Sequence, residues 1–380
     1  MTAAGLRVLH LHSSFSAGGK ELRAARLMNA FGPSLRHVVV SAEPGAHGAA
    51  VALDPALEVA FPGDFPSLQG RPTPARLLRL ARAMKGFDLI LTYNWGAMDA
   101  VLAHRVFGAA LGLGPLVHHE DGFNQDEAER LKPSRNVFRR VALGRASALV
   151  VPSRRLEGIA LGPWRQPRSR VRLIVNGIAT SAFRAAPPAD AVPGLVKAPG
   201  DKWVGTLAGL RRVKNLPRLV RAFAALPPEW RLVILGEGPE RAAIEAQAAA
   251  CGVAGRVVLP GFVADPSRAV GLFDVFALSS DSEQFPISVV EAMAAALPVV
   301  SPAVGDVADM VSVDNRGFVT PPGDEAALAA ALARLAADAG LRGAIGEANR
   351  LRAGAEFDER AMIAAYRETY ARALGRERFP

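Results

Sequence analysis

The stretch AAPPADAVPGLVKAPG, residues 185–200, interrupts the chain near its middle. It is rich in proline and glycine and has neither helical nor strand periodicity, which is typical of a linker or a surface loop. The chain has 380 residues, so roughly 185 remain on each side, enough for a separate hydrophobic core in each part. The stretch therefore favours two domains over one large domain.

Short buried segments with strand character alternate with helical segments on both sides of this stretch. Such alternation is typical of parallel sheets joined by crossover helices. The predicted strands allow one barrel or two doubly wound sheets, and the central stretch favours two Rossmann-like sheets facing a cleft. The predicted strands are 6–12, 37–42, 87–93, 115–120, 148–153, 202–209, 231–236, 256–261, 275–280, 298–303 and 317–321.

The composition is that of a globular protein, with 50% hydrophobic and 21% charged residues. The single cysteine, Cys251, excludes an intramolecular disulfide framework and a cysteine-built zinc site. No segment has the roughly 18 apolar residues that span a bilayer, and the N-terminus lacks a cleavable signal pattern. We expect a cytoplasmic protein that is soluble or peripheral on the inner face of the cell membrane.

The net charge of +9 is concentrated in the first half, where residues 1–190 carry 24 Lys and Arg against 14 Asp and Glu. Such asymmetry indicates an anionic partner: nucleic acid, acidic lipid or an anionic saccharide. Two basic stretches, 74–86 and 130–145, are candidates for an anionic membrane surface, or are ordinary helices with a solvated face. Nucleic acid is disfavoured because interleaved aromatic residues and a known reading module are missing.

In the first basic stretch, helical spacing predicts Arg76, Arg79 and Arg82 on one face. The second, 130–145, carries six positive charges and no acids, and favours an acceptor-binding or membrane surface.

The segment SSDSEQFPISVVEAMAAALPVVSPAVGDVADMV, residues 279–311, contains two acids that are candidates for ligand binding. Glu283 lies in a predicted loop, and Glu291 follows eight positions later on a predicted helix. Two helical turns are about 7.2 residues, so both carboxylates can point the same way. Sugar hydroxyls are suitable partners for such acids. The alternative is a helix-capping acid together with a glutamate paired to an arginine.

The segment AGLRRVKN, residues 208–215, places three positive side chains at the start of a predicted helix. Arg211, Arg212 and Lys214 together with the helix N-terminus favour a diphosphate. A solvated basic loop is the alternative.

The first predicted strand leads into a glycine turn. Gly18 and Gly19 have no Cβ, so their backbone can approach a phosphate at the start of the next helix, or they can form a simple turn. His10 and His12 alternate on the strand and are expected to be packed core residues.

His118 and His119 end another predicted strand and precede Glu120 and Asp121. A histidine at the carboxyl end of a strand can hydrogen-bond a sugar or an acceptor, and either acid could orient the acceptor or receive its proton. Neighbours on a strand face opposite sides, so one histidine is expected to face the ligand. The histidines and acids show no metal-binding spacing, so no metal site is predicted.

Eight segments in order resemble glycosyltransferase family 4, the retaining group 1 glycosyl transferases of the GT-B fold. The pattern E-x(7)-E followed by EAMAAALPVV resembles the nucleotide-sugar signature of that family. The other matching segments are 16–31, 150–160, 175–183, 205–223, 235–241, 257–265 and 315–324.

The resemblance implies roles for residues around the acidic motif. Glu283 would bind the sugar hydroxyls, and Glu291 the ribose of the nucleotide. The backbone N–H groups of Phe285, Ile287 and Ser288 would receive donor oxygens at the helix start.

The resemblance also assigns Lys214 to the donor phosphates. The family usually has an arginine where this chain has Gly209, so Arg211 or Arg212 would take over that charge. A histidine in the region of His119 contacts the donor sugar in the family, and we expect His119, nearer the loop than His118, to do so here. The catalytic candidates are therefore Glu283, Lys214 and His119.

The resemblance implies an acceptor-side domain at 1–180, a donor-binding domain at 181–355, and a helix at 356–380 that crosses back to the first domain. We expect a retaining, metal-independent hexosyltransferase that uses a UDP- or GDP-linked sugar and no other cofactor. Its acceptor would be a glycan or lipid-linked molecule in cell-surface polysaccharide or lipid-linked glycan synthesis.

Two other functions share this fold class. A catalytically inert nucleotide-sugar-binding protein is favoured by Gly209 and Ala296, where the family more often has arginine and glycine. A nicotinamide-dependent oxidoreductase lacks support because the G-x-G-x-x-G fingerprint is missing.

Overall fold

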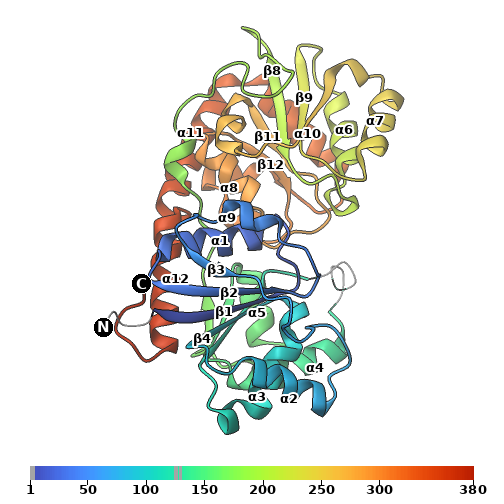
Figure 1. Ribbon diagram of the computed structural model, residues 1–380. Coiled ribbons are helices and arrows are strands. Elements are labelled where there is room, and N and C mark those ends of the chain that lie inside the picture. Colours follow the sequence, from blue (N-terminus) through green and yellow to red (C-terminus); the bar gives the residue numbers. More distant parts are fainter. Residues whose placement is uncertain (1–4, 124–126, 128–130) are drawn as a thin grey trace. The chain divides into compact units, whose positions relative to one another are not determined.

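The computed structural model describes residues 5–123, 127 and 131–380. The chain divides into two compact units: unit 1 comprises Met1–Val175 and Met362–Pro380, and unit 2 comprises Asn176–Ala361 (Figure 1). The sequence placed the first boundary at residue 180 and a returning helix at 356–380, whereas the units of the structure change over after residues 175 and 361.

Unit 1 contains a seven-stranded parallel sheet in the order β3-β2-β1-β4-β5-β6-β7. Its strands are β1 (Leu6–His12), β2 (Leu35–Ser41), β3 (Glu58–Ala60), β4 (Leu89–Tyr93), β5 (Leu116–His119), β6 (Ala148–Val151) and β7 (Val171–Leu173). Its helices are α1 (Gly19–Phe31), α2 (Pro74–Ala83), α3 (Met98–Leu111), α4 (Pro133–Ala142), α5 (Arg154–Leu161) and most of α12 (Glu359–Ala373).

Helices cover both faces of this sheet because each strand buries side chains on both sides. On β1, Val8 packs in a core with α1 and α12, whereas Leu9 and Leu11 pack in a second core with α2, α3 and α5. Figure 1 shows α1 and α12 on one side of the sheet and α2, α3 and α4 on the other.

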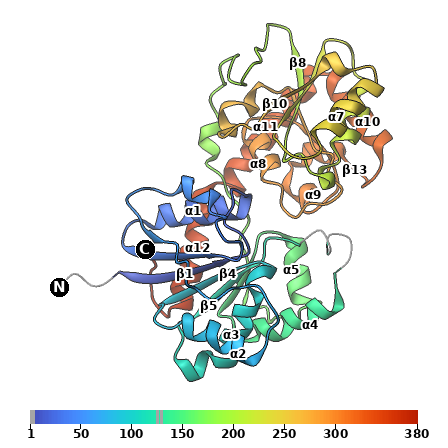
Figure 2. The same cartoon turned by 45° about the vertical axis from the view of Figure 1, so that its right-hand side comes forward.

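Unit 2 contains a six-stranded parallel sheet in the order β10-β9-β8-β11-β12-β13 (Figure 2). Its strands are β8 (Lys202–Leu207), β9 (Trp230–Leu235), β10 (Val257–Gly261), β11 (Val275–Ala277), β12 (Val299–Pro302) and β13 (Val319–Thr320). Its helices are α6 (Leu216–Ala224), α7 (Arg241–Ala250), α8 (Ile287–Ala294), α9 (Val307–Met310), α10 (Glu325–Ala337) and α11 (Ala339–Glu356).

The two separate parallel sheets confirm the prediction of two doubly wound sheets and exclude one barrel. The stretch 185–200 lies inside unit 2 as a largely exposed loop. Lys197 in this loop pairs with Asp274 at 2.8 Å and donates to the carbonyl of Leu272 at 2.6 Å. The stretch is therefore a surface loop attached to unit 2, and not the linker between the units.

Buried histidines and tyrosines of unit 1 form a chain of hydrogen bonds and stacked rings. The His10 ring bridges Nδ1 of His37 at 2.9 Å and the Tyr93 hydroxyl at 3.2 Å. The Tyr93 ring stacks on that of His119 with the centroids 4.5 Å apart, and Nε2 of His119 lies 2.9 Å from the Tyr370 hydroxyl on α12. The chain thus connects β2, β1, β4, β5 and α12, and His10 is a packed core residue as expected.

The last contact of this chain fixes where the protons lie. Nδ1 of His119 is 3.1 Å from the carbonyl oxygen of Thr92, which can only accept, so Nδ1 carries the proton and Nε2 accepts from Tyr370. At the other end of the chain, Nε2 of His37 is buried and has no hydrogen-bond partner among the described residues.

We expect the free energy of unfolding to fall as the pH decreases from 7 to 5. Burial lowers the pKa of His10, lowers that of His37 to about 4 and lowers that of His119 to about 3. Unfolded histidines titrate near 6.5, so below this pH the unfolded state binds more protons than the folded state. Urea unfolding at several pH values measures the slope.

The His37→Asn variant is the control for this prediction, because it removes one of the titrating rings. Its unfolding free energy should fall less steeply between pH 7 and 5 than that of the unchanged protein. Identical slopes, or no fall at all, would contradict the assignment of buried neutral histidines.

Candidate functional site

The centre of the candidate site in unit 2 is an ion pair between Lys214 and Glu283. Nζ of Lys214 donates to Oε1 of Glu283 at 2.5 Å, and the Ser280 hydroxyl donates to the same oxygen at 2.7 Å. The side chains keep 24% and 12% of their exposure, so solvent reaches both groups. The sequence predicted these two residues separately, and the structure brings them together.

Two loops at the carboxyl ends of the adjacent strands β8 and β11 hold this pair. Lys214 ends the 3₁₀ turn η6 (Arg212–Lys214), and its carbonyl accepts from the Ser279 hydroxyl at 2.9 Å. The backbone N–H of Asp281 donates to the carbonyl of Val213 at 2.8 Å. The two loops are therefore cross-linked by hydrogen bonds on both sides of the ion pair.

The two arginines before Lys214 are both exposed but lie in different places. A Cβ built on Gly209 would lie 3.7 Å from Nε of Arg211, which is an ordinary van der Waals contact. The Arg211 side chain therefore runs beside the point from which a side chain at position 209 would start. No atom of Arg212 lies within 4 Å of a Cβ built on Gly209.

Helix α8 begins at Ile287, after Pro286 in the N-cap position. The N–H groups of Ile287 and Ser288 thus lie in its first turn, where a helix supplies no carbonyl partner. The Phe285 ring is buried against Phe357, with the ring centroids 5.7 Å apart. The loop before the helix is packed so closely that a Cβ at Gly305 would lie 2.5 Å from the carbonyl oxygen of Gln284.

The helical argument that related the two acids is wrong, although both residues lie where the sequence placed them. Glu283 is in the loop and Glu291 is half-buried on α8, but α8 begins only at Ile287. Two helical turns therefore do not separate the two residues, and the spacing of eight does not by itself align their carboxylates. Their roles as sugar and ribose ligands stay predictions.

In unit 1, Gly18 and Gly19 lie where β1 leads into α1, with Gly18 in the N-cap position. A Cβ at Gly18 would lie 2.7 Å from Oε2 of Glu21, so the missing side chain makes room for this carboxylate. Lys20 pairs with Glu21, and burial lowers the pKa of Lys20 to about 8. The start of α1 thus carries a carboxylate and a lysine beside the glycine turn.

His118 and His119 point to opposite faces of the sheet, and both are fully buried. Nδ1 of His118 lies 2.8 Å from the Thr92 hydroxyl, whereas both nitrogens of His119 have partners in unit 1, as described above. The pleat therefore separates the two rings as expected. The preference for His119 as a sugar ligand stays a prediction.

Arg23, which contacts the residues after the carboxyl end of β5, was not predicted from the sequence. It is buried on α1 and makes two contacts with the Asp121 carboxylate, Nη1–Oδ1 at 2.5 Å and Nη2–Oδ2 at 2.9 Å. In the sequence, Arg23 is one of two arginines in the matching segment 16–31, and nothing there distinguishes it from Arg26. Asp121, which was predicted as a candidate, is the partner that its burial requires.

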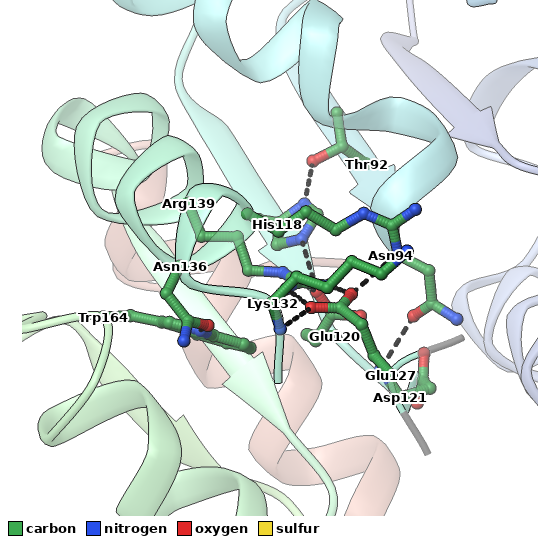
Figure 3. Close-up of polar contacts among 11 residues, drawn as sticks. Thr92, Asn94, His118, Glu120, Asp121, Glu127, Lys132, Asn136, Arg139 and Trp164 are labelled. Carbon is green, nitrogen blue, oxygen red and sulfur yellow. Dashed lines mark hydrogen bonds and ion pairs between the residues drawn. The ribbon is translucent and has the colours of Figure 1, made fainter. Parts of the chain in front are cut away.

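Two arginines of the basic stretches are buried and do not belong to a solvated face. Arg76 is buried and pairs with Asp99 at 2.5 Å, while Arg79 and Arg82 are exposed. Arg139 is fully buried and faces two carboxylates (Figure 3). Both arginines are drawn inward because acids from other segments neutralise them, and a charge pattern along one helix does not reveal such partners.

Two absences are relevant to the site. Among the residues that the structure describes, no group of three His, Cys, Asp or Glu side chains is arranged to hold a metal ion. Within the same residues, no helix is both long enough and apolar enough to cross a membrane.

The two parallel-sheet α/β units have the architecture of GT-B proteins. The structure of HepE from Anabaena in complex with UDP and glucose matches with a TM-score of 0.77 and 22% identity, over 96% of this chain and 99% of HepE. At this identity the likeness shows the fold, which confirms the predicted fold class.

Two family models match consecutive parts of the chain. "Glycosyltransferase Family 4" matches residues 17–182, and "Glycosyl transferases group 1" matches residues 192–352. The chain therefore belongs to the family 4, group 1 glycosyltransferases, as the resemblance indicated.

Curated relatives match over shorter regions. N-acetyl-alpha-D-glucosaminyl L-malate synthase of Bacillus anthracis is 25% identical over 172 residues, 45% of this chain and 45% of the relative. The lipopolysaccharide core biosynthesis glycosyltransferase LpsE of Rhizobium meliloti is 30% identical over 158 residues, 42% of this chain and 46% of the relative. The chain thus spans less than half the length of these relatives.

Proposed function

We propose that this protein is a retaining, metal-independent glycosyltransferase that moves a hexosyl group from a nucleoside diphosphate sugar to an acceptor hydroxyl. The observation that carries the proposal is the Lys214–Glu283 pair at the ends of β8 and β11, beside the start of α8. A cation suits a diphosphate, a carboxylate suits sugar hydroxyls, and helix N–H groups suit either ligand oxygen. The UDP and glucose bound by HepE support this choice of donor.

In the bound state, Lys214 exchanges the Glu283 carboxylate for the donor diphosphate, and Glu283 becomes available to the sugar hydroxyls. Glu291 binds the ribose, and the N–H groups of Phe285, Ile287 and Ser288 receive donor oxygens. In unit 1, His119 contacts the sugar, and the backbone of Gly18 and Gly19 approaches the donor phosphates. These last assignments follow the family resemblance.

The reaction breaks the bond between the anomeric carbon and the leaving phosphate oxygen. The acceptor oxygen forms the new bond on the same face, and the acceptor proton passes to the leaving phosphate. Such a step needs no enzyme nucleophile, so the protein contributes orientation and stabilisation of the developing negative charge. A positive side chain at the diphosphate supplies that stabilisation without a divalent metal ion.

Arg211 is the residue that supplies the charge missing at Gly209, since its guanidinium lies beside the origin of a side chain at that position. Gly209 was one reason to consider an inert sugar-nucleotide-binding protein, and Ala296 was the other. Ala296 has φ +59° and follows α8, where its N–H donates to the carbonyl of Met293 at 3.0 Å. An alanine in place of glycine at position 296 therefore affects only the backbone strain at the end of α8, and it does not argue against catalysis.

The acceptor is a glycan or lipid-linked molecule, and the reaction belongs to cell-surface polysaccharide or lipid-linked glycan synthesis at the cytoplasmic face of the membrane. The LpsE relative supports this class of acceptor. The Bacillus anthracis relative, named as a synthase of an L-malate conjugate, shows that a small-molecule acceptor also occurs among the similar proteins.

Release of UDP or GDP from their common sugar conjugates tests the proposed function, and Glu283→Gln is the informative variant. An enzyme should lose turnover about a hundredfold while it still binds the free nucleotide, because the lost hydrogen bonds act on the sugar. An inert binder would release no nucleotide in either form. That result from the unchanged protein, with all donors and in EDTA, would contradict the proposal.

We expect Arg211→Ala to weaken the binding of UDP or GDP about tenfold or more, because a charged hydrogen bond contributes roughly 1.5–3 kcal/mol. Arg212→Ala is the matched control and should change the dissociation constant less than threefold. The thermal unfolding midpoint in EDTA measures both, since ligand at 100 times its Kd adds about 2.7 kcal/mol of stability.

The double variant Gly209→Arg/Arg211→Ala moves the guanidinium to the position that the family uses, and should recover the affinity lost in Arg211→Ala. A Cβ at position 209 would make only ordinary van der Waals contacts, at 3.7 Å and more. Equal losses in Arg211→Ala and Arg212→Ala, or no recovery in the double variant, would show that Arg211 has no special role. Binding of the unphosphorylated nucleoside should be the same in all forms.

The exposed basic face of α2 and α4 is the proposed contact with an anionic membrane. Both helices pack beside α3 and have no acidic residue. Arg79, Arg82 and Arg140 are exposed, and on α4 the apolar side chains of Val137 and Val141 keep 60% and 48% of their exposure. Basic residues attract acidic headgroups, while exposed valines can enter the interface.

We expect the triple variant Arg79→Gln/Arg82→Gln/Arg140→Gln to bind phosphatidylglycerol-containing vesicles about a hundredfold more weakly, at about 1 kcal/mol per basic residue. Sedimentation with vesicles measures the partition coefficient. Vesicles of phosphatidylcholine alone should bind neither form.

The control for this prediction removes three exposed arginines from unit 2, Arg231, Arg268 and Arg316. It has the same net charge as the triple variant of unit 1. If both variants lose the same affinity, or if the unchanged protein does not bind the anionic vesicles, the proposed membrane contact is wrong.

A further inference from the structure

Arg139 is a fully buried arginine at the centre of a charged cluster in unit 1 (Figure 3). Its Nε donates to Oε2 of Glu120 at 3.3 Å. Its Nη1 and Nη2 donate to the two oxygens of Glu127 at 3.2 and 3.1 Å. Both carboxylate side chains are completely buried, so three charged groups share one site removed from water.

The cluster is close to electrically neutral, which explains how it tolerates burial. Arg135 donates to Oε2 of Glu127 at 2.9 Å and supplies the second positive charge. Burial opposes ionisation of Glu127, but the hydrogen bonds from Arg139 and Arg135 lower its pKa below the usual value. A carboxylate that stays ionised in this environment holds its arginine partners firmly.

Aromatic rings surround the remaining surface of the Arg139 guanidinium. The ring centroids of Trp95, Trp164 and Phe123 lie 4.8, 4.9 and 5.3 Å from its central carbon. Trp164 is itself held by Asn136 of α4, whose side-chain oxygen accepts from the indole N–H at 3.0 Å. The guanidinium is thus fixed both by directed hydrogen bonds and by flat apolar faces.

The cluster joins segments that follow the carboxyl ends of two adjacent strands. Trp95 begins the turn η2 (Trp95–Ala97) after β4, and Glu120 is the residue directly after β5. Ligands of doubly wound sheets bind at this edge. Arg139 does not need to reach the ligand itself, because it holds the backbone from which neighbouring side chains extend.

Asp121, the residue after Glu120, is held from the side of α1. The Asp121 carboxylate accepts hydrogen bonds from both terminal nitrogens of Arg23 on α1. The backbone N–H of Asp121 donates to Oδ1 of Asn94 at 2.7 Å. Glu120 and Asp121 are therefore clamped to α4 and α1 respectively. The backbone at 119–122 is fixed between these two clamps, and Asp121 and Gly122 remain partly exposed.

We propose that Arg139 is a positioning residue of the unit 1 ligand edge: through Glu120 and Glu127 it fixes the segment 119–122 in the geometry that sugar transfer requires. The inference rests on the proposed function. Loss of the clamp displaces His119 and Asp121 without touching the nucleotide residues of unit 2. A displacement of about 1 Å at a reacting group can lower the rate up to a hundredfold.

Arg139→Lys is the test variant, because it keeps the buried positive charge and removes the forked set of donors. Arg71→Lys, at an exposed arginine of the same unit outside the proposed membrane contact, is the control. We expect Arg139→Lys to lower kcat for release of UDP or GDP from the donor at least tenfold relative to the control. The shift in unfolding midpoint that free UDP or GDP produces should stay the same.

Equal kcat values in the two variants would overturn the inference. If Arg139→Lys fails to fold, Glu127→Gln replaces it. This variant removes only one carboxylate, and the glutamine side chain has nearly the same size as the glutamate. A reduced kcat with an unchanged nucleotide response supports the positioning role, and a kcat within twofold of Arg71→Lys overturns it.

If the unchanged protein cleaves no donor, the proposed function fails, and amide hydrogen exchange decides on the clamp alone. Exchange at residues 118–123 should then be faster in Arg139→Lys than in Arg71→Lys, with equal exchange in unit 2. Equal exchange at residues 118–123 would overturn the clamp as well.

Discussion

The contact between Lys214 and Glu283 joins the two loops of unit 2 on which the proposed donor site is built. The two side chains meet at 2.5 Å and neutralise each other's charge. The pair forms because parallel pairing of β8 and β11 brings their carboxyl ends to the same edge of the sheet. In the proposed function, a ligand at this edge replaces the ion pair with one between its phosphate and the lysine, and with hydrogen bonds from its hydroxyls to the glutamate. The pair therefore holds both groups at this edge until a ligand separates them.

The strands that the sequence predicts well are those buried on both faces. Near-continuous apolar runs mark β1, β4 and β9, and no other arrangement of these segments buries them as completely. The two strands that it missed, β3 and β7, have three residues each and lie at opposite edges of the unit 1 sheet. An edge strand of this length has one neighbour and buries little, so its sequence resembles a loop. Tertiary pairing alone defines such strands.

The sequence predicted the excess of positive charge in the first half of the chain, but not which of the positive side chains are buried. A count along the chain shows an excess of arginine and lysine in the first half, but it cannot show which side chains turn inward. Arg139 turns inward because Glu120 and Glu127 come from a different segment and because three aromatic rings surround it. Periodicity along a helix describes a face, whereas burial of a charge depends on acids elsewhere in the fold. Lys214, Glu283 and Asp121 were each predicted singly from the sequence, whereas the long-range pairs that they form, Lys214 with Glu283 and Asp121 with Arg23, were not.

Unit 1 thus uses its buried polar groups in two distinct ways on the two faces of one sheet. On the face of α1 and α12, neutral histidines and tyrosines form a chain of hydrogen bonds and stacked rings, in which one carbonyl oxygen fixes the protons of His119. On the face of α4, ionised groups balance one another around Arg139. The neutral chain weakens when a proton is added, whereas the ionic cluster has strong hydrogen bonds that hold the charges. Since β5 and the residues after it contribute alternately to both, the segment 118–121 is fixed by side chains on each face. A segment held from both sides needs little reorganisation when a substrate arrives, and low reorganisation is what electrostatic catalysis requires.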